Sequence, residues 1–295
     1  MILQAGCPNW QPLNELTEEE VETARTYLMG YKHFNLDDIQ IARTVNEVFV
    51  RSFRAQRQYS NNLSSPPTVR DIIQEWPCIL KSVYLCQHYF LLTNVLSDTI
   101  SQNFINRRIE IFIYAHQNSV IELDAVKSSD DRDYLALSLV LKKFKEPMDR
   151  VFHPLALNIS IQEEWPFNYP SVRVTKDVIT NAGSEEEPQN KKKTKYSLII
   201  DKKKILSTFY LEEILAGLLC SYFVLNRTYP AACSATFEFL QMYFANVFSS
   251  QECRSKLAKQ KLKASTFNNA LKKMNVGTYL SKEEIATLNS DLMNR

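Results

Sequence analysis

The sequence predicts a mainly helical α+β protein, with a helical module followed by a small sheet packed with a buried helix pair, and a basic helical tail. Three observations predict this class. Apolar residues recur at helical spacing along most of the chain, the clearest alternating β-prone runs lie between residues 155 and 201, and a long apolar run follows them. With 295 residues, of which 45% are hydrophobic, the chain can bury a sizeable core.

Turn-forming and charged stretches divide the chain into four segments. We expect an N-terminal helical arm at residues 1–60, a helical module at 66–118 whose first helix ends at Trp-Pro, a mixed α/β domain at 119–249 with a mobile loop at 181–195, and a basic segment with a C-terminal helix at 250–295. The loop has no apolar residue larger than alanine, so burial cannot offset the entropy cost of ordering it.

The N-terminal arm is predicted to form two helices. "LTEEEV" begins the first, because Thr17 can accept a hydrogen bond from the backbone N–H of Glu20 while the Glu20 side chain returns the bond. Gly30 is expected to close this helix. The second runs from Leu36 to Gln58, with the aspartates at 37 and 38 in its first turn, where acidic side chains suit the helix dipole.

The helical module begins with "SPPTVRDIIQEWPCIL", in which Thr68 can cap a short helix. Pro77 lacks the N–H that a helix would use and disfavours helical geometry at Trp76, so the helix must stop there. Trp76 is therefore expected to anchor the corner of the chain. Two further helices are predicted, near Val83 to Asn94 and near Ile100 to Ala115.

The mixed domain contains one ambiguous stretch. "DYLALSLVLKKF" alternates like a strand, yet it also fits a buried helix after a cap at Asp130 or Asp131, and the helix is favoured. Three short strands are expected, near residues 155–161, 171–175 and 196–201.

The longest apolar run extends from Ile214 to Leu225, about twelve residues where a bilayer span needs about twenty. We therefore expect a buried helix over 211–225 and no membrane contact. After the turn "NRTYP" a second helix is predicted, with Pro230 in its first turn. Its shared apolar face would comprise Phe237, Leu240, Phe244 and Val247.

The C-terminal segment joins a basic stretch to a short helix. "RSKLAKQKLK" supplies candidate nucleic-acid or partner contacts, namely Arg254, Lys256, Lys259, Lys261 and Lys263. In "LSKEEI", Ser281 and Glu284 fit a capping box. The candidate partner helix that follows has a stripe of Ile285, Leu288 and Leu292, which can fold back onto the core or enter another chain's groove.

Two other basic features have plainer explanations than phosphate binding. Arg51, Arg54 and Arg57 step along one helix, where dipole complementation and solvation account for them. "KKKTK" at 191–195 resembles a short nuclear-import cluster, although loop solvation explains it better. For the C-terminal cluster the two interpretations are nearly even. Aromatic residues are not interleaved with these clusters, which disfavours single-strand binding.

Catalytic and metal motifs are missing from the sequence. Five glycines include no phosphate-binding loop, and four histidines show no HExxH spacing or paired cysteines. Six scattered cysteines without CxxC favour a reducing compartment. A cysteine nucleophile with a distant histidine stays open, since such pairs meet only in space. We expect no catalytic, cofactor-binding or metal-binding residues, and an intracellular location, cytoplasmic or nuclear.

The order of several stretches resembles a known family. These are "NWQPL", "ARTVNEVFVRSFRAQRQ", "SPPTVRDIIQEWPCIL", "DDRDYLALSLVLKKF", "YSLIIDKKKI" and "LAGLLCSYFVLNRTYPAACSATFEFLQMYF". Together they resemble the C-terminal region of the sterile alpha motif domain-containing protein 3-like proteins of animals, over roughly residues 9–248, without the sterile alpha motif itself. The resemblance implies no activity and no functional residues.

These observations predict a non-catalytic intracellular interaction or scaffold module with an unidentified protein partner. The alternative is a nucleic-acid-associated factor that uses the C-terminal basic segment. An enzyme with a cryptic site comes third.

Overall fold

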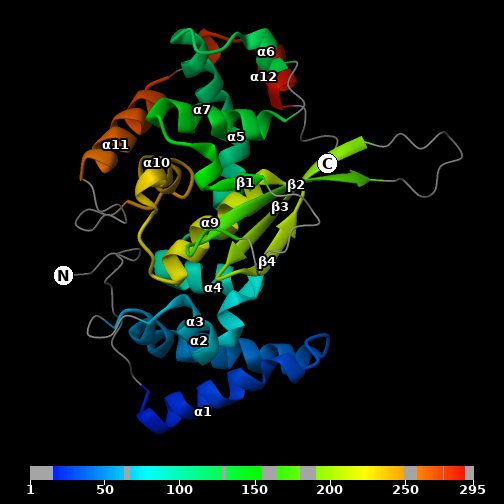
Figure 1. Ribbon diagram of the computed structural model, residues 1–295, viewed down its shortest axis with the longest axis vertical. Coiled ribbons are helices and arrows are strands. Elements are labelled where there is room, and N and C mark those ends of the chain that lie inside the picture. Colours follow the sequence, from blue (N-terminus) through cyan, green and yellow to red (C-terminus); the bar gives the residue numbers. More distant parts are fainter. Residues whose placement is uncertain are drawn as a thin grey trace, which may run out of the picture.

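The computed structural model describes residues 16–62, 67–127, 131–154, 165–179, 191–248, 258–274 and 276–289. These residues form an elongated, mainly helical α+β structure with a small sheet packed against the helices (Figure 1). The N-terminal helices lie at one end, and α6 and α12 lie at the other. The predicted fold class is confirmed.

The described helices flank the strands in the sequence, with α1 to α7 before the sheet and α9 to α12 after it. They are α1 (Glu18–Met29), α2 (Ile39–Ser60), α3 (Val69–Glu75), α4 (Ser82–Thr93), α5 (Ser97–Gln117), α6 (Leu123–Lys127), α7 (Arg132–Phe144), α9 (Leu211–Val224), α10 (Ser234–Tyr243), α11 (Ala258–Lys272) and α12 (Lys282–Asn289). Short 3₁₀ turns occupy Gly30–His33, Pro77–Leu80, Met148–Arg150, Ala231–Cys233 and Val276–Thr278.

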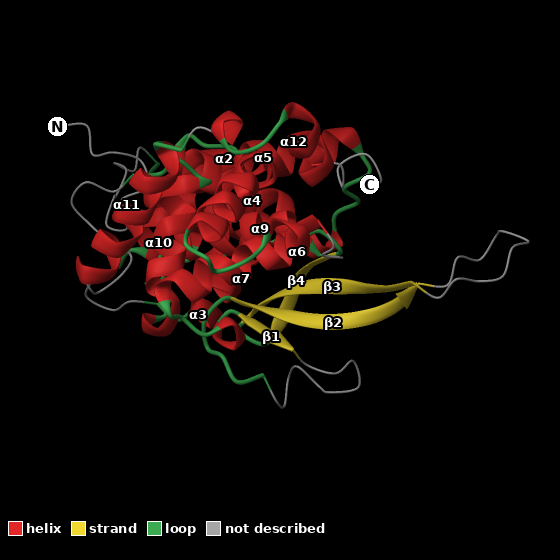
Figure 2. Ribbon diagram, turned by 90° about the horizontal axis from the view of Figure 1, so that it is seen from above, coloured by secondary structure: helices red, strands yellow, loops and turns green. Residues whose placement is uncertain are grey.

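The described strands form one sheet in the order β1-β2-β3-β4. They are β1 (Phe152–Pro154), β2 (Ser171–Ile179), β3 (Lys191–Ile200) and β4 (Lys203–Thr208). β1 is parallel to β2, and the other two pairs are antiparallel. Figure 2 shows the sheet along one side of the helices, with β2 and β3 extending away from them.

The strand predictions were right where the structure describes the chain. Residues 171–175 lie in β2 and residues 196–200 lie in β3, whereas 155–161 fall outside the described residues. The predicted mobile loop at 181–195 was wrong in its last five residues, because Lys191 to Lys195 belong to β3 and pair with Ile179 to Thr175 of β2. The prediction weighed composition alone, whereas pairing satisfies the backbone of these residues. Residues 181–190 lie outside the described residues.

Helix α9 lies at the centre of the core, as predicted for 211–225. Every residue of α9 except Glu213 is buried. It packs on the sheet with one side and on α4 and α5 with another. Gly217 faces the sheet, where a Cβ atom would lie 3.3 Å from Leu206 Cδ2 and 3.5 Å from Leu198 Cδ2. The glycine therefore permits the close approach of helix to sheet.

The predicted helix caps are present. Thr17 and Glu20 exchange hydrogen bonds of 3.2 and 2.9 Å at the start of α1. Thr68 caps α3, and the Asp131 side chain accepts from the backbone N–H of Tyr134 at the start of α7. The favoured helix over "DYLALSLVLKKF" is therefore confirmed.

The N-terminus of α12 and the C-terminus of α1 are also as predicted. Ser281 and Glu284 form the reciprocal bonds that precede α12. Gly30 is the C-cap of α1, with φ −75°, and the chain continues from it as a 3₁₀ turn.

Trp76 ends α3 as expected. Its φ and ψ of −130° and 67° leave the helical region, and its side chain is only 2% exposed within the core. Pro77 then starts a 3₁₀ turn that leads into α4. The predicted corner anchor is confirmed.

Two helix boundaries differ from prediction. α2 begins at Ile39, because the Asp38 carboxylate accepts from the backbone N–H groups of Gln40 and Ile41 and so acts as the N-cap instead of lying in the first turn. Asp37 accordingly precedes the helix.

The second difference is at α10, which ends at Tyr243. Phe244 and Val247 are buried as predicted, but they lie beyond the helix, where the Val247 N–H donates to the Gln241 carbonyl oxygen. Pro230 precedes a 3₁₀ turn and is not in the first turn of α10.

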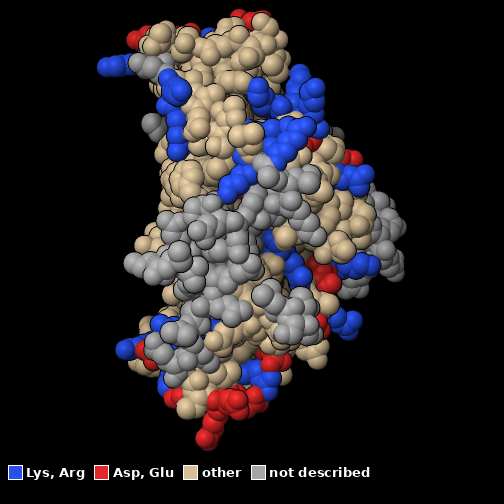
Figure 3. Space-filling view, turned by 90° about the vertical axis from the view of Figure 1, so that its left-hand side faces the viewer, with Lys and Arg blue, Asp and Glu red and all other residues tan. Residues whose placement is uncertain are grey.

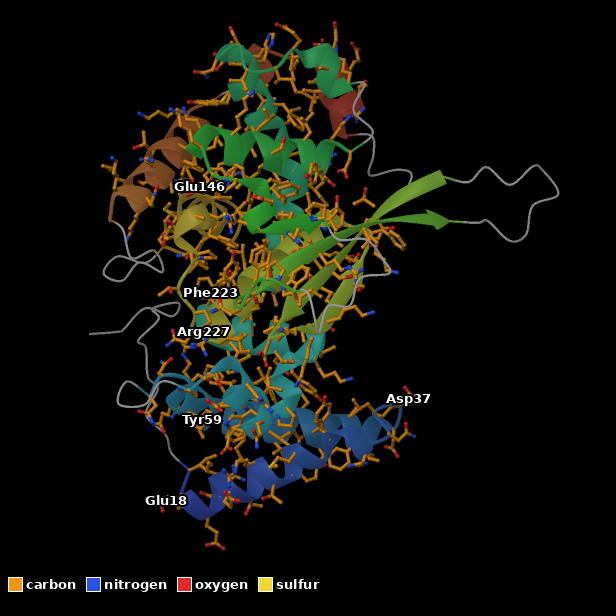
Figure 4. All side chains as sticks on the ribbon, viewed as in Figure 1. Glu18, Asp37, Tyr59, Glu146, Phe223 and Arg227 are labelled. Atoms are coloured by element: carbon orange, nitrogen blue, oxygen red, sulfur yellow. The ribbon has the colours of Figure 1, made fainter. Side chains whose placement is uncertain are left out.

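One buried core contains residues of all four predicted segments, from Leu28 to Leu280. Contacts between distant residues join the segments. Arg227 Nη2 donates a 2.7 Å hydrogen bond to the Pro67 carbonyl oxygen, and Figure 4 shows Arg227 between Phe223 of α9 and Tyr59 of α2. Among the described helices, none is both long and apolar enough to cross a bilayer.

Candidate functional site

His88 is buried in the core between α2 and α4. Its Nδ1 lies 3.2 Å from Gln56 Oε1, while Gln56 Nε2 donates to the Phe49 carbonyl oxygen and to Ser52 Oγ. Because the amide nitrogen is already donating, Oε1 must accept, and this network assigns the proton to Nδ1 of a neutral imidazole. Burial and the nearby Arg57 charge hold the pKa of His88 well below its usual value. His88 is thus a packed core residue.

The described cysteines differ in the pKa of their thiols. Burial raises the pKa of Cys78 and of Cys233 to about 12, and raises that of the fully buried Cys220 as well. Cys86 on α4 is half-buried, and hydrogen bonds from Cys220 and Ser97 lower the pKa of its thiol to about 7 although burial opposes them. Within the described ranges, no three His, Cys, Asp or Glu side chains gather in a way that could hold a metal.

The predicted C-terminal lysines lie on α11. Lys259 and Lys263 are exposed and Lys261 is half-buried, whereas Arg254 and Lys256 fall outside the described residues. α11 contains no acidic residue. Its opposite side packs on α10, where the Phe267 ring stacks on Phe239 with centroids 4.7 Å apart. The packing leaves the lysines on the outer side of the helix.

The end of α7 adds two lysines to this surface. Lys142 and Lys143 line a pocket of about 240 Å³ together with Phe267 of α11. Lys143 Nζ donates a 2.6 Å hydrogen bond to Tyr114 Oη and lies 5.9 Å from the centroid of the Phe267 ring. Sequence reasoning missed these lysines, because more than a hundred residues separate them from α11.

The other end of α11 carries Lys272 and, just after it, Lys273, both exposed. Lys272 Nζ lies 4.9 Å from the ring centroid of Phe248, a side chain that is 49% exposed. An exposed aromatic ring is therefore present beside the lysines.

We define the α11 lysine surface as six residues, Lys142, Lys143, Lys259, Lys263, Lys272 and Lys273. Figure 3 looks onto the side of the molecule where α11 lies, and Lys and Arg side chains gather in the upper half of that view. None of the six forms an ion pair with a carboxylate of the described chain. Their positive charge is therefore not neutralised by a carboxylate in the described residues.

The predicted partner helix folds back onto the core. α12 packs on α5 and α6, and Ile285 is half-buried against the core cluster. Arg132 holds α12 in place, since its Nη1 donates to the Thr287 carbonyl oxygen at 3.1 Å. The structure describes neither the side chain of Leu288 nor Leu292. Ile285 is therefore not presented to another chain in this structure.

The three α2 arginines do not form a phosphate site. Arg57 is fully buried and donates to the Phe223 carbonyl oxygen at 3.0 Å. Arg51 pairs with Glu20 of α1 at 2.5 Å. A second buried arginine, Arg108, pairs with Asp133 of α7. The sequence contains no local signal for either buried arginine, because each partner lies elsewhere in the chain.

Comparisons with protein-family models, with curated proteins and with solved structures find no match to this chain. The resemblance to the sterile alpha motif domain-containing protein 3-like proteins stays a prediction. The arrangement of charge on α7 and α11 is the feature with the clearest chemical meaning.

Proposed function

We propose that this chain is a non-catalytic intracellular interaction protein that binds nucleic acid through the α11 lysine surface. The observation that carries the proposal is the set of six lysines from two distant segments that form no ion pair with a carboxylate among the residues that the structure describes. Lysines gathered on a protein surface attract phosphates and release the counterions bound to them.

The length of the surface suits a nucleic-acid backbone. From Lys259 to Lys272 the helix rises by about 20 Å at 1.5 Å per residue. That length corresponds to roughly six steps of about 3.4 Å along one duplex strand. Lys259 and Lys263 lie one helical turn apart on the same side of α11, so they can contact phosphates of one strand at the same time, whereas Lys272 lies about 180° around the helix from Lys263.

The kind of side chain indicates how the ligand is recognised. Lysine is a flexible point charge, and its contacts with phosphates carry no sequence information. Phe248 beside Lys272 offers one ring on which an unpaired base can stack. We therefore expect binding with little sequence preference and a strong dependence on salt.

The partner-helix alternative has less support than the lysine surface. To bind a partner through its apolar stripe, α12 would have to move Ile285 out of the core and break the hydrogen bond between Arg132 and the carbonyl oxygen of Thr287. A protein partner that needs this helix must offset those losses. The lysine surface requires no such rearrangement.

The test is the binding of fluorescent duplex DNA and single-stranded RNA of about twenty nucleotides, by anisotropy, between about 50 and 200 mM salt. A double variant, Lys259→Gln with Lys263→Gln, should bind at least tenfold more weakly at the lowest salt. Its slope of log affinity against log salt for duplex should fall by about 2. The matched control is Arg43→Gln with Arg51→Gln, two exposed arginines on α2 that each pair with a glutamate, so this variant removes the same charge.

Two results would overturn the proposal. One is the absence of binding to either nucleic acid at the lowest salt. The other is an equal loss of affinity in the α2 control, which would indicate a response to net charge alone.

A further inference from the structure

A second cationic site lies at the other end of the molecule. A groove of about 550 Å³ is formed where the end of α1, the α3 corner and the strand β4 meet. Four cations line it, Arg70, Lys81, Lys203 and Lys204, and none of its lining residues is acidic. These residues come from three separate parts of the chain, so the groove exists only in the folded protein.

The four cations are exposed and have no ion-pair partner in the described part of the chain. Asp71 is the sequence neighbour of Arg70, but its carboxylate accepts from the N–H and the hydroxyl of Thr68, each at 2.7 Å. The cap thus holds this carboxylate at the helix start, where its bonds with Thr68 lower the pKa of Asp71 and the charge of Arg70 also helps to lower it. The three lysines of the groove have no ion pair among the described residues, so a ligand can balance their charge.

The β3–β4 hairpin brings its two lysines to the groove. Ile199 pairs with Lys204 whereas Leu198 pairs with Leu206, so Ile205 is an extra residue in β4. In a regular strand successive side chains point to opposite faces. A bulge breaks that alternation and re-aims side chains, which explains why consecutive residues of β4 line one groove.

The remainder of the groove is largely apolar. Ile73, Pro77 and Leu80 contribute to it from the corner that Trp76 anchors. Tyr31 also lines the groove, and Lys81 Nζ lies 5.8 Å from the centroid of its ring. The site therefore combines an apolar wall with a set of cations.

We propose that this groove binds a small molecule that carries two or more phosphates on an apolar or aromatic body. Its volume falls within the range of about 300 to 1,000 Å³ typical of small-ligand sites. The Arg70 guanidinium can bind a phosphate through two hydrogen bonds, and the lysines act as point charges around it. A single carboxylate would leave most of the four positive charges unbalanced, whereas a diphosphate or triphosphate balances them.

The experiment measures binding of ATP without magnesium to the whole chain by isothermal titration calorimetry at about neutral pH. ATP supplies both phosphates and an aromatic ring. We expect one site, with affinity reduced at least tenfold in the double variant Arg70→Gln with Lys204→Gln. Lys81→Gln, on another element, should weaken binding severalfold. All three residues are exposed, so these variants should keep the wild-type melting temperature.

Three probes and one control separate the contribution of the phosphates to the affinity from that of the apolar wall. Tripolyphosphate should bind several times more weakly than ATP, because it leaves the apolar wall uncovered, and adenosine should show no measurable binding. The control is Lys259→Gln with Lys263→Gln on α11, which should bind ATP as the wild type does. This control is also the variant that loses nucleic-acid binding, so the two proposals can fail separately.

The proposal is overturned if ATP does not bind, or if the groove variants bind it as tightly as the wild type. It is also overturned if the α11 control weakens ATP binding as much as the groove variants do. Equal affinities for tripolyphosphate and ATP would contradict the apolar or aromatic body of the proposed ligand.

Discussion

Arg57 Nη1 donates a 3.0 Å hydrogen bond to the carbonyl oxygen of Phe223, and so joins α2 to the central helix α9. Arg57 is fully buried, although it lies in a helix whose other arginines reach solvent. The two residues are 166 positions apart in the chain. This contact therefore ties the N-terminal arm to the core.

Replacing Arg57 by alanine should destabilise the protein by about 2 to 5 kcal/mol, because it opens a cavity and leaves the Phe223 carbonyl oxygen without this donor. Arg51→Ala is the control, since it removes only an exposed ion pair and should destabilise the protein far less. Urea unfolding followed by circular dichroism measures both. Equal midpoints for the two variants would contradict a structural role for Arg57.

His88 should make stability depend on pH. Its pKa in the folded protein is lowered by burial, whereas in the unfolded chain it is about 6.5. Below that pH the unfolded state binds a proton that the folded state does not, so the free energy of unfolding should fall as the pH falls. The expected contribution is about 1.4 kcal/mol per pH unit below about 6.

The control for this effect is His88→Gln, which cannot titrate. Urea unfolding at pH 7, 6 and 5 should show a smaller loss of stability for this variant than for the wild type. Parallel losses in the two proteins would show that other groups cause the pH dependence.

Cys86 should be modified at neutral pH. A pKa of about 7 leaves about half of its thiol as thiolate at pH 7, so alkylation by iodoacetamide should rise up to about pH 8 and then level off. Mass spectrometry of the peptide that contains Cys86 measures the rate. In Cys220→Ala the main hydrogen bond is lost, and the rate at pH 7 should fall. A rate that keeps rising tenfold per pH unit up to pH 9 would contradict the lowered pKa.

Arg132 should control the attachment of α12. Besides the Thr287 carbonyl oxygen, it binds the carbonyl oxygens of Val126 and Lys127, so it joins α12 to the end of α6. In Arg132→Gln, amide hydrogens of residues 282–289 should exchange faster, by tenfold or more, while those of α9 stay protected. Unchanged exchange in α12 would mean that its apolar contacts alone hold it.

Local features of the fold were predictable from the sequence. Thr17, Thr68 and Ser281 cap helices through residues three positions away, so the signal lies within one short stretch. The end of α3 at Trp76 was predictable for the same reason, because the adjacent Pro77 prevents the helix from continuing. By contrast, the pairing of Lys191 to Lys195 with β2 depends on a strand elsewhere in the chain. A prediction from composition considers how these lysines are solvated and not which strand they pair with, so it placed them in a loop.

The candidate sites were predictable only in part. Lys259 and Lys263 were identified, because they are close in the sequence. Lys142 and Lys143 join them only through the packing of α7 near α11. The groove near Arg70 was not anticipated at all, since its cations are single residues or pairs in three segments. Charge clusters formed by tertiary packing have no signal in any short window of sequence.

The central position of α9 also affects how the chain is made. α4 and α5, which pack on α9, are complete at Gln117, whereas α9 begins at Leu211. At about 5 to 20 residues per second, a ribosome takes roughly 5 to 20 s to synthesise the intervening segment. During that time α9 is not yet present, so the apolar side chains of α4 and α5 that later pack on it are exposed and can bind chaperones. The core can therefore be completed only after α9 has been synthesised, late in the synthesis of the chain.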